Sequence, residues 1–343
     1  MTIGWALLGP GRHADTNVLP QIKNAAGARM VAVLSRDAAR GEAFAAKHGF
    51  AKVYTALADL LADGEVDALY DCTPDGSHAA NAVAGAAAGK HILIEKPLAI
   101  SPSEGEKVIA ACRAAGVTLG VVYQQRHEEA LIEARRMIAA GEIGEVHLAR
   151  VQVNLRVASA PPGGGNWRAD PTMRSGGTLM SLGDHAFDMM TYLLGQTIDK
   201  IVAFTDATQD NPPNERVASM LFKLSKGTIG HAISSGRIPF GRRPIEIHGS
   251  TGTLVIDNAF AYLAGDGGDP TLTLELVNAN GKNVRQFAPT PCFQREVEQF
   301  GRAIEGKGAP MTSAEEALAA IRISDAFYET VRSGRVADVS ALN

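Results

Sequence analysis

Lys96 stands where a parallel sheet would present a side chain to a ligand. The segment HILIEKPLAIS places Glu95, Lys96 and Pro97 after a short apolar run that has the pattern of a buried strand. Ligands of open α/β sheets bind at the carboxyl ends of the strands. A lysine at that point is either aimed into the ligand cleft or exposed to solvent at the end of its strand. The spacing alone favours neither interpretation.

A glycine-rich turn near the start of the chain predicts a second ligand-binding feature. In WALLGPGRHADTNVLP an apolar run ends at Gly9, Gly11 follows, and Ala14 stands where a third glycine could be. Gly9 would allow a tight turn, Gly11 would let backbone amides approach a pyrophosphate, and Ala14 would let the next helix pack closely. We interpret this as a dinucleotide-binding turn that includes Arg12 and His13. The alternative is a packing turn that binds nothing.

The end of the second predicted strand indicates which dinucleotide would bind. An NAD site usually has Asp or Glu about twenty residues past the glycines, and here Ser35 and Arg36 occupy that place. A hydroxyl beside a guanidinium suits a 2′-phosphate, because arginine pairs with phosphate through two hydrogen bonds. Arg40, one helical turn on, could assist, whereas Asp37 is expected to cap the next helix. The sequence therefore predicts NADP in preference to NAD, unless Arg36 is only a solvated surface residue.

Up to residue 122, short apolar runs alternate with alanine-rich stretches of helical period. The runs expected to be strands are Ile3–Leu8, Met30–Leu34, Ala68–Cys72, His91–Ile94 and Val117–Val122. The stretches expected to be helices are His13–Ala25, Asp37–His48, His78–Gly89 and Pro102–Ala115. Strands that are apolar along their whole length, alternating with helices, predict an α/β domain over residues 1–122 with a doubly wound parallel sheet.

The pattern changes after residue 122 and predicts a second, α+β domain over residues 123–343. Its expected helices are Glu128–Ala140, Gly176–Leu194, Phe293–Glu305 and Ala314–Ser333, the last of which could pack back on the first domain. Its expected strands are Glu145–Val157, Lys200–Asp206, Arg216–Leu224, Thr228–Ser234, Ile245–Gly249 and Thr253–Ile256. Runs of strands with few helices indicate a mostly antiparallel sheet.

Composition excludes several classes of protein. The net charge of -4 gives no electrostatic footprint for nucleic acid or for an anionic membrane surface. No apolar run approaches the ~18 residues of a transmembrane helix, and no signal peptide is apparent. The three cysteines are far apart and odd in number, so neither a disulfide framework nor a metal site is expected. We expect a cytoplasmic protein.

Three segments of the chain resemble the Gfo/Idh/MocA oxidoreductases: GPGRHA, CTPDGSHAANAVAGAAAGKHILIEKPLA and SGGTLMSLGDHAFDMMTYLLG. The resemblance implies an N-terminal Rossmann domain and a C-terminal domain with a large open sheet. It also implies hydride exchange between NAD(P) and a carbinol or carbonyl carbon of a sugar, polyol or similar compound. In such a protein Lys96 contacts the nicotinamide ribose and the substrate, and its bond to Pro97 is often cis. Thr73, Pro74 and His78 fall in the cofactor-contacting loop.

The family carries an Asp and a His four residues apart on a helix, in a D-x-G-x-H pattern. Here His185 matches the histidine, Ser181 replaces the aspartate, and Asp184 stands beside the histidine, about 100° away around a helix. Loss of the aspartate removes a charge that would favour protonated Lys96 or bind substrate hydroxyls. Ser181, His185 and Asp188 would share one helical face. Asp188 could fix the tautomer of His185 or be a plain surface carboxylate.

Aromatic and basic residues flank the expected cleft. Tyr123 and Trp167 could stack on nicotinamide or a sugar ring, and Arg126, Arg168 or Arg174 could bind a substrate carboxylate. Each could equally be a packing residue. The expected substrate-binding residues are Lys96, Arg126, Trp167, Arg168, Ser181, Asp184 and His185.

The sequence thus predicts an NADP-dependent oxidoreductase acting on a sugar, sugar acid or polyol. Lys96 would be the acid–base group, and His185 would position the substrate or relay the proton. Two alternatives stay open: a lyase or glycosidase that retains NAD, and a non-catalytic NADP-binding sensor, which Ser181 suggests. A large exposed sheet face would need a cover, so a homodimer or homotetramer through the second domain is expected.

Overall fold

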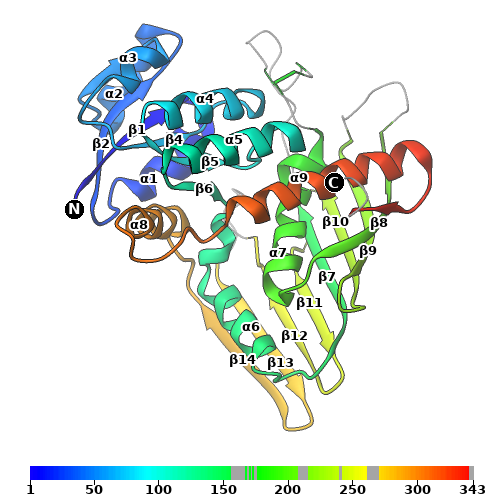
Figure 1. Ribbon diagram of the computed structural model, residues 1–343. Helices are drawn as coiled ribbons and strands as arrows, with labels where there is room; N and C mark the ends of the chain where they lie inside the picture. The colour runs from blue at the N-terminus through cyan, green and yellow to red at the C-terminus, as the bar shows by residue number, and fades with distance from the viewer. Residues whose placement is uncertain are drawn as a thin grey trace. The chain divides into compact units, whose positions relative to one another are not determined.

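The computed structural model describes residues 1–155, 167, 170, 172–173, 176–207, 215–238, 242–260 and 270–339. These residues form two compact units, whose elements are labelled in Figure 1. The first unit takes the described residues of Met1–Gln124, Trp167–Ser175 and Pro291–Ile321, and the second takes those of Gln125–Asn166, Gly176–Thr290 and Arg322–Asn343. Neither unit is therefore continuous in the sequence.

The first unit is built on a six-stranded sheet in the order β3-β2-β1-β4-β5-β6. Its strands are β1 Ile3–Leu8, β2 Ala28–Leu34, β3 Lys52–Tyr54, β4 Ala68–Asp71, β5 His91–Glu95 and β6 Leu119–Val122. Every pairing between these strands is parallel, and β1 is buried along its whole length. The predicted doubly wound parallel sheet is confirmed.

Helices cover both faces of this sheet. They are η1 Ala14–Val18, α1 Leu19–Ile22, α2 Ala38–His48, α3 Leu57–Leu61, α4 Asp75–Ala87, α5 Pro102–Ala115 and α8 Cys292–Ile304. Alternate residues of β1 face two different cores. Leu8 belongs to the core that includes α4 and α5, and Leu7 to the core that includes α1, α2 and α8. The alternation follows from the two-residue period of a strand.

Local signals in the sequence set the ends of these helices. The side chains of Asp37 and Ser101 accept backbone N–H hydrogen bonds at the starts of α2 and α5. Gly49 and Gly116 end the same helices with left-handed φ angles of 82° and 66°, which glycine adopts without a steric cost. The predicted capping role of Asp37 is confirmed.

The second unit carries a nine-stranded sheet in the order β14-β13-β12-β11-β7-β10-β9-β8-β15. Its strands are β7 Val146–Asn154, β8 Ile198–Thr205, β9 Val217–Leu224, β10 Ile229–Ser235, β11 Ile245–Gly249, β12 Gly252–Asp257, β13 Leu272–Asn278, β14 Gly281–Phe287 and β15 Ala337–Asp338. Among the described pairings β7–β10 is parallel and the others are antiparallel. The predicted mostly antiparallel sheet is confirmed.

One face of this sheet is covered by helices. The other helices that the structure describes are η2 Gln124–His127, α6 Glu129–Ala139, η4 Leu179–Gly183, α7 Asp184–Leu194 and α9 Ala314–Ser333. The first part of α9, up to Ile321, belongs to the first unit. Phe222 of β9 packs edge-on against Phe187 of α7, with ring centroids 5.6 Å apart. Leu221, which points to the opposite face, is 52% exposed. No helix within the described ranges is long and apolar enough to cross a membrane.

Candidate active site

The glycine turn has the conformation that close backbone approach requires. Gly9 has a φ of 82°, its N–H donates to the carbonyl of Leu34, and a Cβ at Gly9 would lie 2.9 Å from the carbonyl oxygen of Cys72. The space around Gly11 is open, because an added Cβ would meet no atom closer than 3.9 Å. Ala14 is fully buried where the next helix begins. The conformations predicted for this turn are confirmed.

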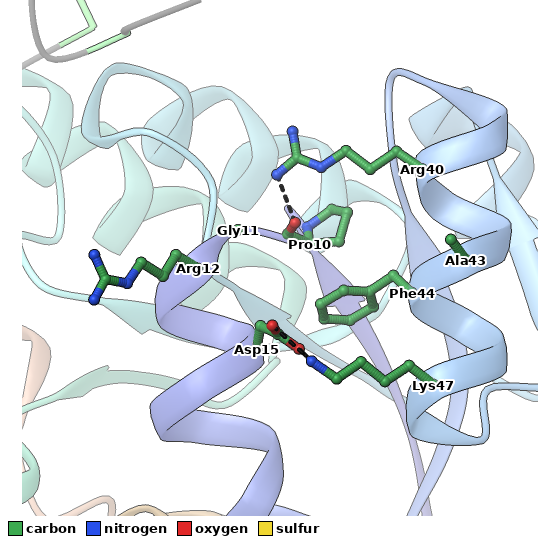
Figure 2. A pocket seen from close by; sticks show the side chains of 8 residues that line it. All are labelled: Pro10, Gly11, Arg12, Asp15, Arg40, Ala43, Phe44 and Lys47. Atoms are coloured by element: carbon green, nitrogen blue, oxygen red, sulfur yellow. Dashed lines mark hydrogen bonds and ion pairs between the residues drawn. The ribbon is translucent and has the colours of Figure 1, made fainter. Parts of the chain in front are cut away.

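A cavity of about 340 Å³ lies between this turn and α2 (Figure 2). Its lining residues are Pro10, Gly11, Arg12, Asp15, Arg40, Ala43, Phe44 and Lys47. The guanidinium of Arg40 reaches over the turn and donates to the carbonyl of Pro10 at 2.6 Å. Three cations and one carboxylate among the lining residues favour an anionic ligand. The open turn and these cations fit the phosphates of a dinucleotide.

Asp15 is the carboxylate of this cavity, and its charge is already balanced. It accepts from Lys47 Nζ at 2.7 and 2.8 Å and lies 2.6 Å from His48 Nε2. The hydrogen bonds from Lys47 and His48 lower the pKa of Asp15 below its usual value. Arg12 and Arg40 therefore dominate the charge that the cavity presents to a ligand.

The residues predicted to recognise a 2′-phosphate follow β2. Ser35 is buried, and its Oγ donates to the carbonyl of Asp37 at 2.7 Å. Arg36 is exposed. Asp37 accepts from the backbone N–H of Arg40 at 2.9 Å through its Oδ1, which confirms its predicted capping role. Of the three predicted ligands, Arg40 lines the cavity, and the roles of all three in cofactor binding stay predictions.

The loop after β4 is tied to the lysine segment by His78. Thr73 donates from its N–H and its hydroxyl to Asp71, and Pro74 precedes α4. His78 is 1% exposed, with Nδ1 2.7 Å from the carbonyl of Pro97 and Nε2 3.0 Å from the carbonyl of Thr73. Carbonyl oxygens only accept, so both bonds form together only when both ring nitrogens carry hydrogen.

Lys96 follows β5 directly, at the same edge of the sheet as the glycine turn. Its peptide bond to Pro97 is cis, as the resemblance implied. Glu95, the last residue of the strand, lies 3.0 Å from His13 Nε2 through its Oε1. The same oxygen accepts from the hydroxyl of Tyr70 at 3.0 Å. The structure thus joins two predicted cofactor residues, His13 and Glu95, and adds Tyr70, which the sequence analysis did not select.

The predicted aromatic stacking residues lie in different surroundings. Tyr123 is 1% exposed and belongs to the core that includes α4 and α5. Trp167 is half-buried, and its carbonyl accepts from the N–H of Asp170. Arg168 and Arg174 lie outside the described residues. Stacking by either aromatic side chain stays a prediction.

The histidine helix of the second unit begins with a π-helical turn, η4, and not with the α-helix expected from Gly176 onward. Ser181 therefore lies in the π-helical turn, whereas His185 and Asp188 lie on α7, and the shared face stays a prediction. Ser181 is exposed, and its Oγ donates to the carbonyls of Gly177 and Thr178 at 3.2 and 3.3 Å. His185 and Asp184 are 2% and 1% exposed.

Asp188 takes part in a pairing that the sequence analysis did not predict. Its Oδ1 accepts from Nε of Arg126 at 2.9 Å and from Nη2 at 2.6 Å. The hydroxyl of Tyr192 donates to the carbonyl of Arg126 at 3.3 Å, and the guanidinium lies 5.1 Å from the Tyr192 ring centroid. These contacts tie α7 to the segment before α6. A role for Arg126 in binding substrate stays a prediction.

A buried carboxylate holds the start of the histidine helix and explains its glycine pair. Glu215, 2% exposed, accepts from the N–H of Leu179 at 2.9 Å and from the hydroxyl of Tyr328 at 3.2 Å. A Cβ on Gly177 would overlap this carboxyl group, and one on Gly176 would overlap the Tyr328 hydroxyl. Glu215 gave no sequence signal, because it lies far along the chain from the residues it contacts.

Among the described residues, no group of three or more His, Cys, Asp or Glu side chains is placed to hold an ion.

Two family models match the chain. One, described as an oxidoreductase family with an NAD-binding Rossmann fold, matches residues 3–123. The other, described as the GFO/IDH/MocA C-terminal domain, matches residues 131–255.

Named relatives match almost the whole chain. The D-xylose 1-dehydrogenase (NADP(+)) 2 of Haloferax volcanii is 32% identical over 337 residues, covering 98% of this chain and 99% of that protein. The 1,5-anhydro-D-fructose reductase of Ensifer adhaerens is 28% identical over 336 residues, covering 98% of each. The structure of an aldose-aldose oxidoreductase from Caulobacter crescentus, complexed with glycerol, matches with a TM-score of 0.87 and 22% identity. That match covers 98% of this chain and all of the other, and at this identity it shows the fold.

Proposed function

Because this chain belongs to the GFO/IDH/MocA oxidoreductase family, we propose that it uses NADP to transfer hydride to or from a sugar, sugar acid or polyol. The reacting carbon would be a carbinol or carbonyl carbon. The observation that carries the proposal is the position of Lys96, directly after β5 and held by contacts of Glu95 and Pro97 to the loops of the same sheet edge. The names of the two relatives above, a xylose dehydrogenase and an anhydrofructose reductase, support a sugar as substrate.

Different residues of the first unit would bind different parts of the cofactor. The backbone of Gly9–Gly11 and the side chains of Arg12 and Arg40 would bind the phosphates. Ser35 and Arg36 would complete the contact with a 2′-phosphate. A nicotinamide dinucleotide, when bound, supplies the hydride acceptor or donor. NADP is proposed over NAD because Ser35 and Arg36, and not a carboxylate, directly follow β2.

Lys96 would carry the proton of the reaction. When an alcohol is oxidised, the hydroxyl proton passes to the Lys96 amine while hydride leaves from the carbinol carbon. In the reverse direction the ammonium returns the proton to the carbonyl oxygen as hydride arrives. His185 would orient the substrate oxygen or relay the proton. Lys96 thus accounts for the proton and the dinucleotide for the electron pair of the hydride, without a metal.

Turnover by a lysine variant tests this proposal. The purified protein is titrated with NADPH and NADH and then screened against sugars and sugar acids by the absorbance of reduced nicotinamide. We expect Lys96→Ala to lower kcat at least ~100-fold, as loss of a general acid–base group does. Lys107→Ala, an exposed lysine on α5, is the control and should keep full activity. Full turnover by Lys96→Ala, or no binding of either NADP form, would refute the proposal.

Two other functions would give different results in the same assay. A cofactor that stays bound through purification and is not consumed would indicate a lyase or glycosidase that oxidises and re-reduces its substrate. Measurable affinity without turnover on any sugar would indicate a sensor. The sensor is the alternative that Ser181 favours, because a carboxylate of the family pattern is replaced there by a hydroxyl bonded to backbone carbonyls.

We also propose that the second unit pairs with a further copy of this chain through the open face of its sheet. Apolar side chains on that face are exposed: Phe204 by 80%, Leu221 by 52%, Ile229 by 45% and Val284 by 49%. Exposed apolar side chains that lie together on one face favour an interface with another protein surface. Light scattering after gel filtration should give a dimer or tetramer, and Leu221→Lys should lower the measured mass.

A further inference from the structure

A line of hydrogen bonds runs from the cofactor-binding helix to the strand that ends at Lys96. Asn17 Nδ2 lies 3.0 Å from His13 Nδ1, and His13 Nε2 lies 3.0 Å from Glu95 Oε1. Tyr70 donates to the same carboxylate oxygen at 3.0 Å. The line thus joins η1, β4 and β5 at the edge of the sheet where a dinucleotide would lie.

The direction of these bonds fixes the state of each group. The Asn17 amide nitrogen only donates, so His13 Nδ1 accepts and Nε2 carries the hydrogen that goes to Glu95.

The carboxylate at the centre of this line is buried and charged. Burial by itself would raise the pKa of Glu95, but the hydrogen bonds from His13 and Tyr70 and the charge of Lys96 lower it overall. Burial, and then the charge of Glu95, raises the pKa of Tyr70 well above its usual range, so this hydroxyl keeps its proton and donates. Glu95 therefore has two fixed donors.

Lys96 lies between two anchored residues. On one side Glu95 is held by His13, from the first turn of the helix after Gly11. On the other side the carbonyl of Pro97 is held by His78, from α4. The two anchors differ, because His78 is 1% exposed, whereas the His13 side chain is 41% exposed and lies beside the glycine turn.

We propose that His13 is a positioning residue for Lys96. Through Glu95 it holds the strand end that carries the lysine, and it does so from the turn that would bind the cofactor phosphates. The inference rests on the proposed function for its effect on turnover. Its structural part, that His13 restrains the end of β5, is independent of any activity.

Hydrogen exchange measures the structural part without substrate or cofactor. In His13→Ala we expect the amides at the end of β5 to exchange about tenfold faster than in the wild type, whereas those of β6 keep their rates. His91→Ala is the matched control: His91 begins the same strand and accepts one hydrogen bond, at 3.0 Å, from the N–H of Thr118. It should leave the C-terminal end of β5 unchanged. Wild-type exchange rates in His13→Ala, or equal acceleration by both variants, would overturn the proposal.

Kinetics then separate positioning from a merely structural role. With a substrate found in the screen, His13→Ala should lower kcat about tenfold, and by a larger factor than it raises the Kd for NADPH, because small misplacements of a reacting group are costly. His13→Gln, which keeps a neutral donor, should recover part of kcat. An unchanged kcat in His13→Ala would overturn the proposal. If the wild-type protein turns over no sugar, the proposed function fails, and the exchange rates alone decide on His13.

Discussion

Arg126 and Asp188 form an ion pair in which each side chain is only 3% exposed. Both guanidinium donors go to one carboxylate oxygen, at 2.9 and 2.6 Å, and Tyr192 packs against the same arginine. The pair joins the helix of His185 to the segment that precedes α6. A substrate carboxylate at Arg126 would have to compete with this pairing.

Removing one partner of this pair should destabilise the protein strongly. Asp188→Leu leaves a buried guanidinium without its carboxylate and is expected to cost ~3–5 kcal/mol of unfolding free energy. The double variant Arg126→Met with Asp188→Leu should cost less than the sum of the two single changes. Urea unfolding of the four proteins measures the coupling, and additive costs would contradict the pairing. If the double variant keeps its KM for substrate, Arg126 is not a substrate ligand.

The choice between NADP and NAD should depend on Arg40. Its guanidinium lines the cavity beside the glycine turn, and a phosphate would gain a charge-assisted contact there. We expect Arg40→Ala to weaken NADPH binding about tenfold and NADH binding hardly at all. Arg29→Ala, an exposed arginine at the opposite end of β2, should change neither affinity. Equal losses of affinity for NADPH and NADH would show that Arg40 acts only by holding the glycine turn through its contact with Pro10.

Gly177 should not tolerate a side chain. A Cβ there would overlap the carboxyl group of Glu215, which holds the start of the His185 helix. Gly177→Ala is expected to lower the unfolding free energy by ~1–3 kcal/mol and to lower turnover with it. Gly64→Ala is a suitable comparison, because a Cβ at Gly64 meets nothing within 4 Å. That variant should stay within about 0.5 kcal/mol of the wild type.

Asp63 should contribute a pH-dependent part of the stability. The hydrogen bonds from Lys52 and from the N–H of Glu65 lower the pKa of Asp63 from 3.8 to about 2. Because the folded-state pKa is the lower one, the contribution is full above pH 3.8 and is lost as the pH falls towards about 2. We expect ~1–2 kcal/mol, reduced because solvent screens Lys52. The difference in urea midpoint between the wild type and Asp63→Asn should shrink over that pH range; a constant difference would contradict the assignment.

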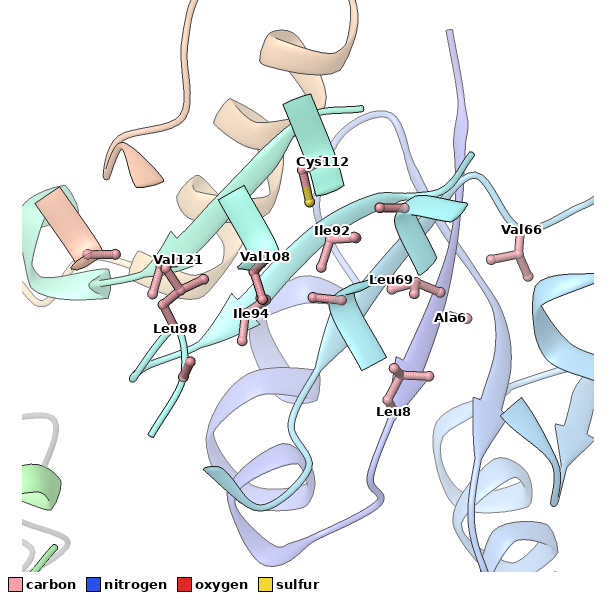
Figure 3. Close-up of a cluster of buried hydrophobic side chains, with 14 of the residues drawn as sticks. Ala6, Leu8, Val66, Leu69, Ile92, Ile94, Leu98, Val108, Cys112 and Val121 are labelled. Carbon is pink, nitrogen blue, oxygen red and sulfur yellow. The ribbon is translucent and has the colours of Figure 1, made fainter. Parts of the chain in front are cut away.

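Much of the first unit could be predicted because its strands are apolar on both faces. Ile92 and Ile94 of β5, for example, face the core drawn in Figure 3, where Val108 and Cys112 of α5 meet them. Buried strands of this kind leave continuous apolar runs in the sequence. The three-residue strand β3 and the five-residue helix α3 were missed because elements that short carry no measurable period. β14 was missed because six of its seven residues are exposed and mostly polar.

The candidate site was predictable where its residues are neighbours in the sequence. Gly9, Gly11 and Lys96 were selected from motifs that lie at strand ends. Tyr70 and Glu215 were not selected, because each contacts a residue far away in the sequence. Glu95 comes 25 residues after Tyr70, and Leu179 comes 36 residues before Glu215. The π-helical turn before Asp184 was also missed, because an α-helix was expected from Gly176 onward.

The discontinuous first unit has a consequence during protein synthesis. Phe293, Val297 and Phe300 of α8 belong to the same core as Trp5 and Tyr70, and the Trp5 and Phe300 ring centroids are 5.7 Å apart. When residues 1–124 emerge from the ribosome, the aromatic side chains of that core therefore lack part of their final cover. The core becomes complete only after the strands of the second unit from β7 to β14 have been translated. The nascent chain thus exposes Trp5 and its neighbours for most of its elongation, which is the interval in which a chaperone could bind them.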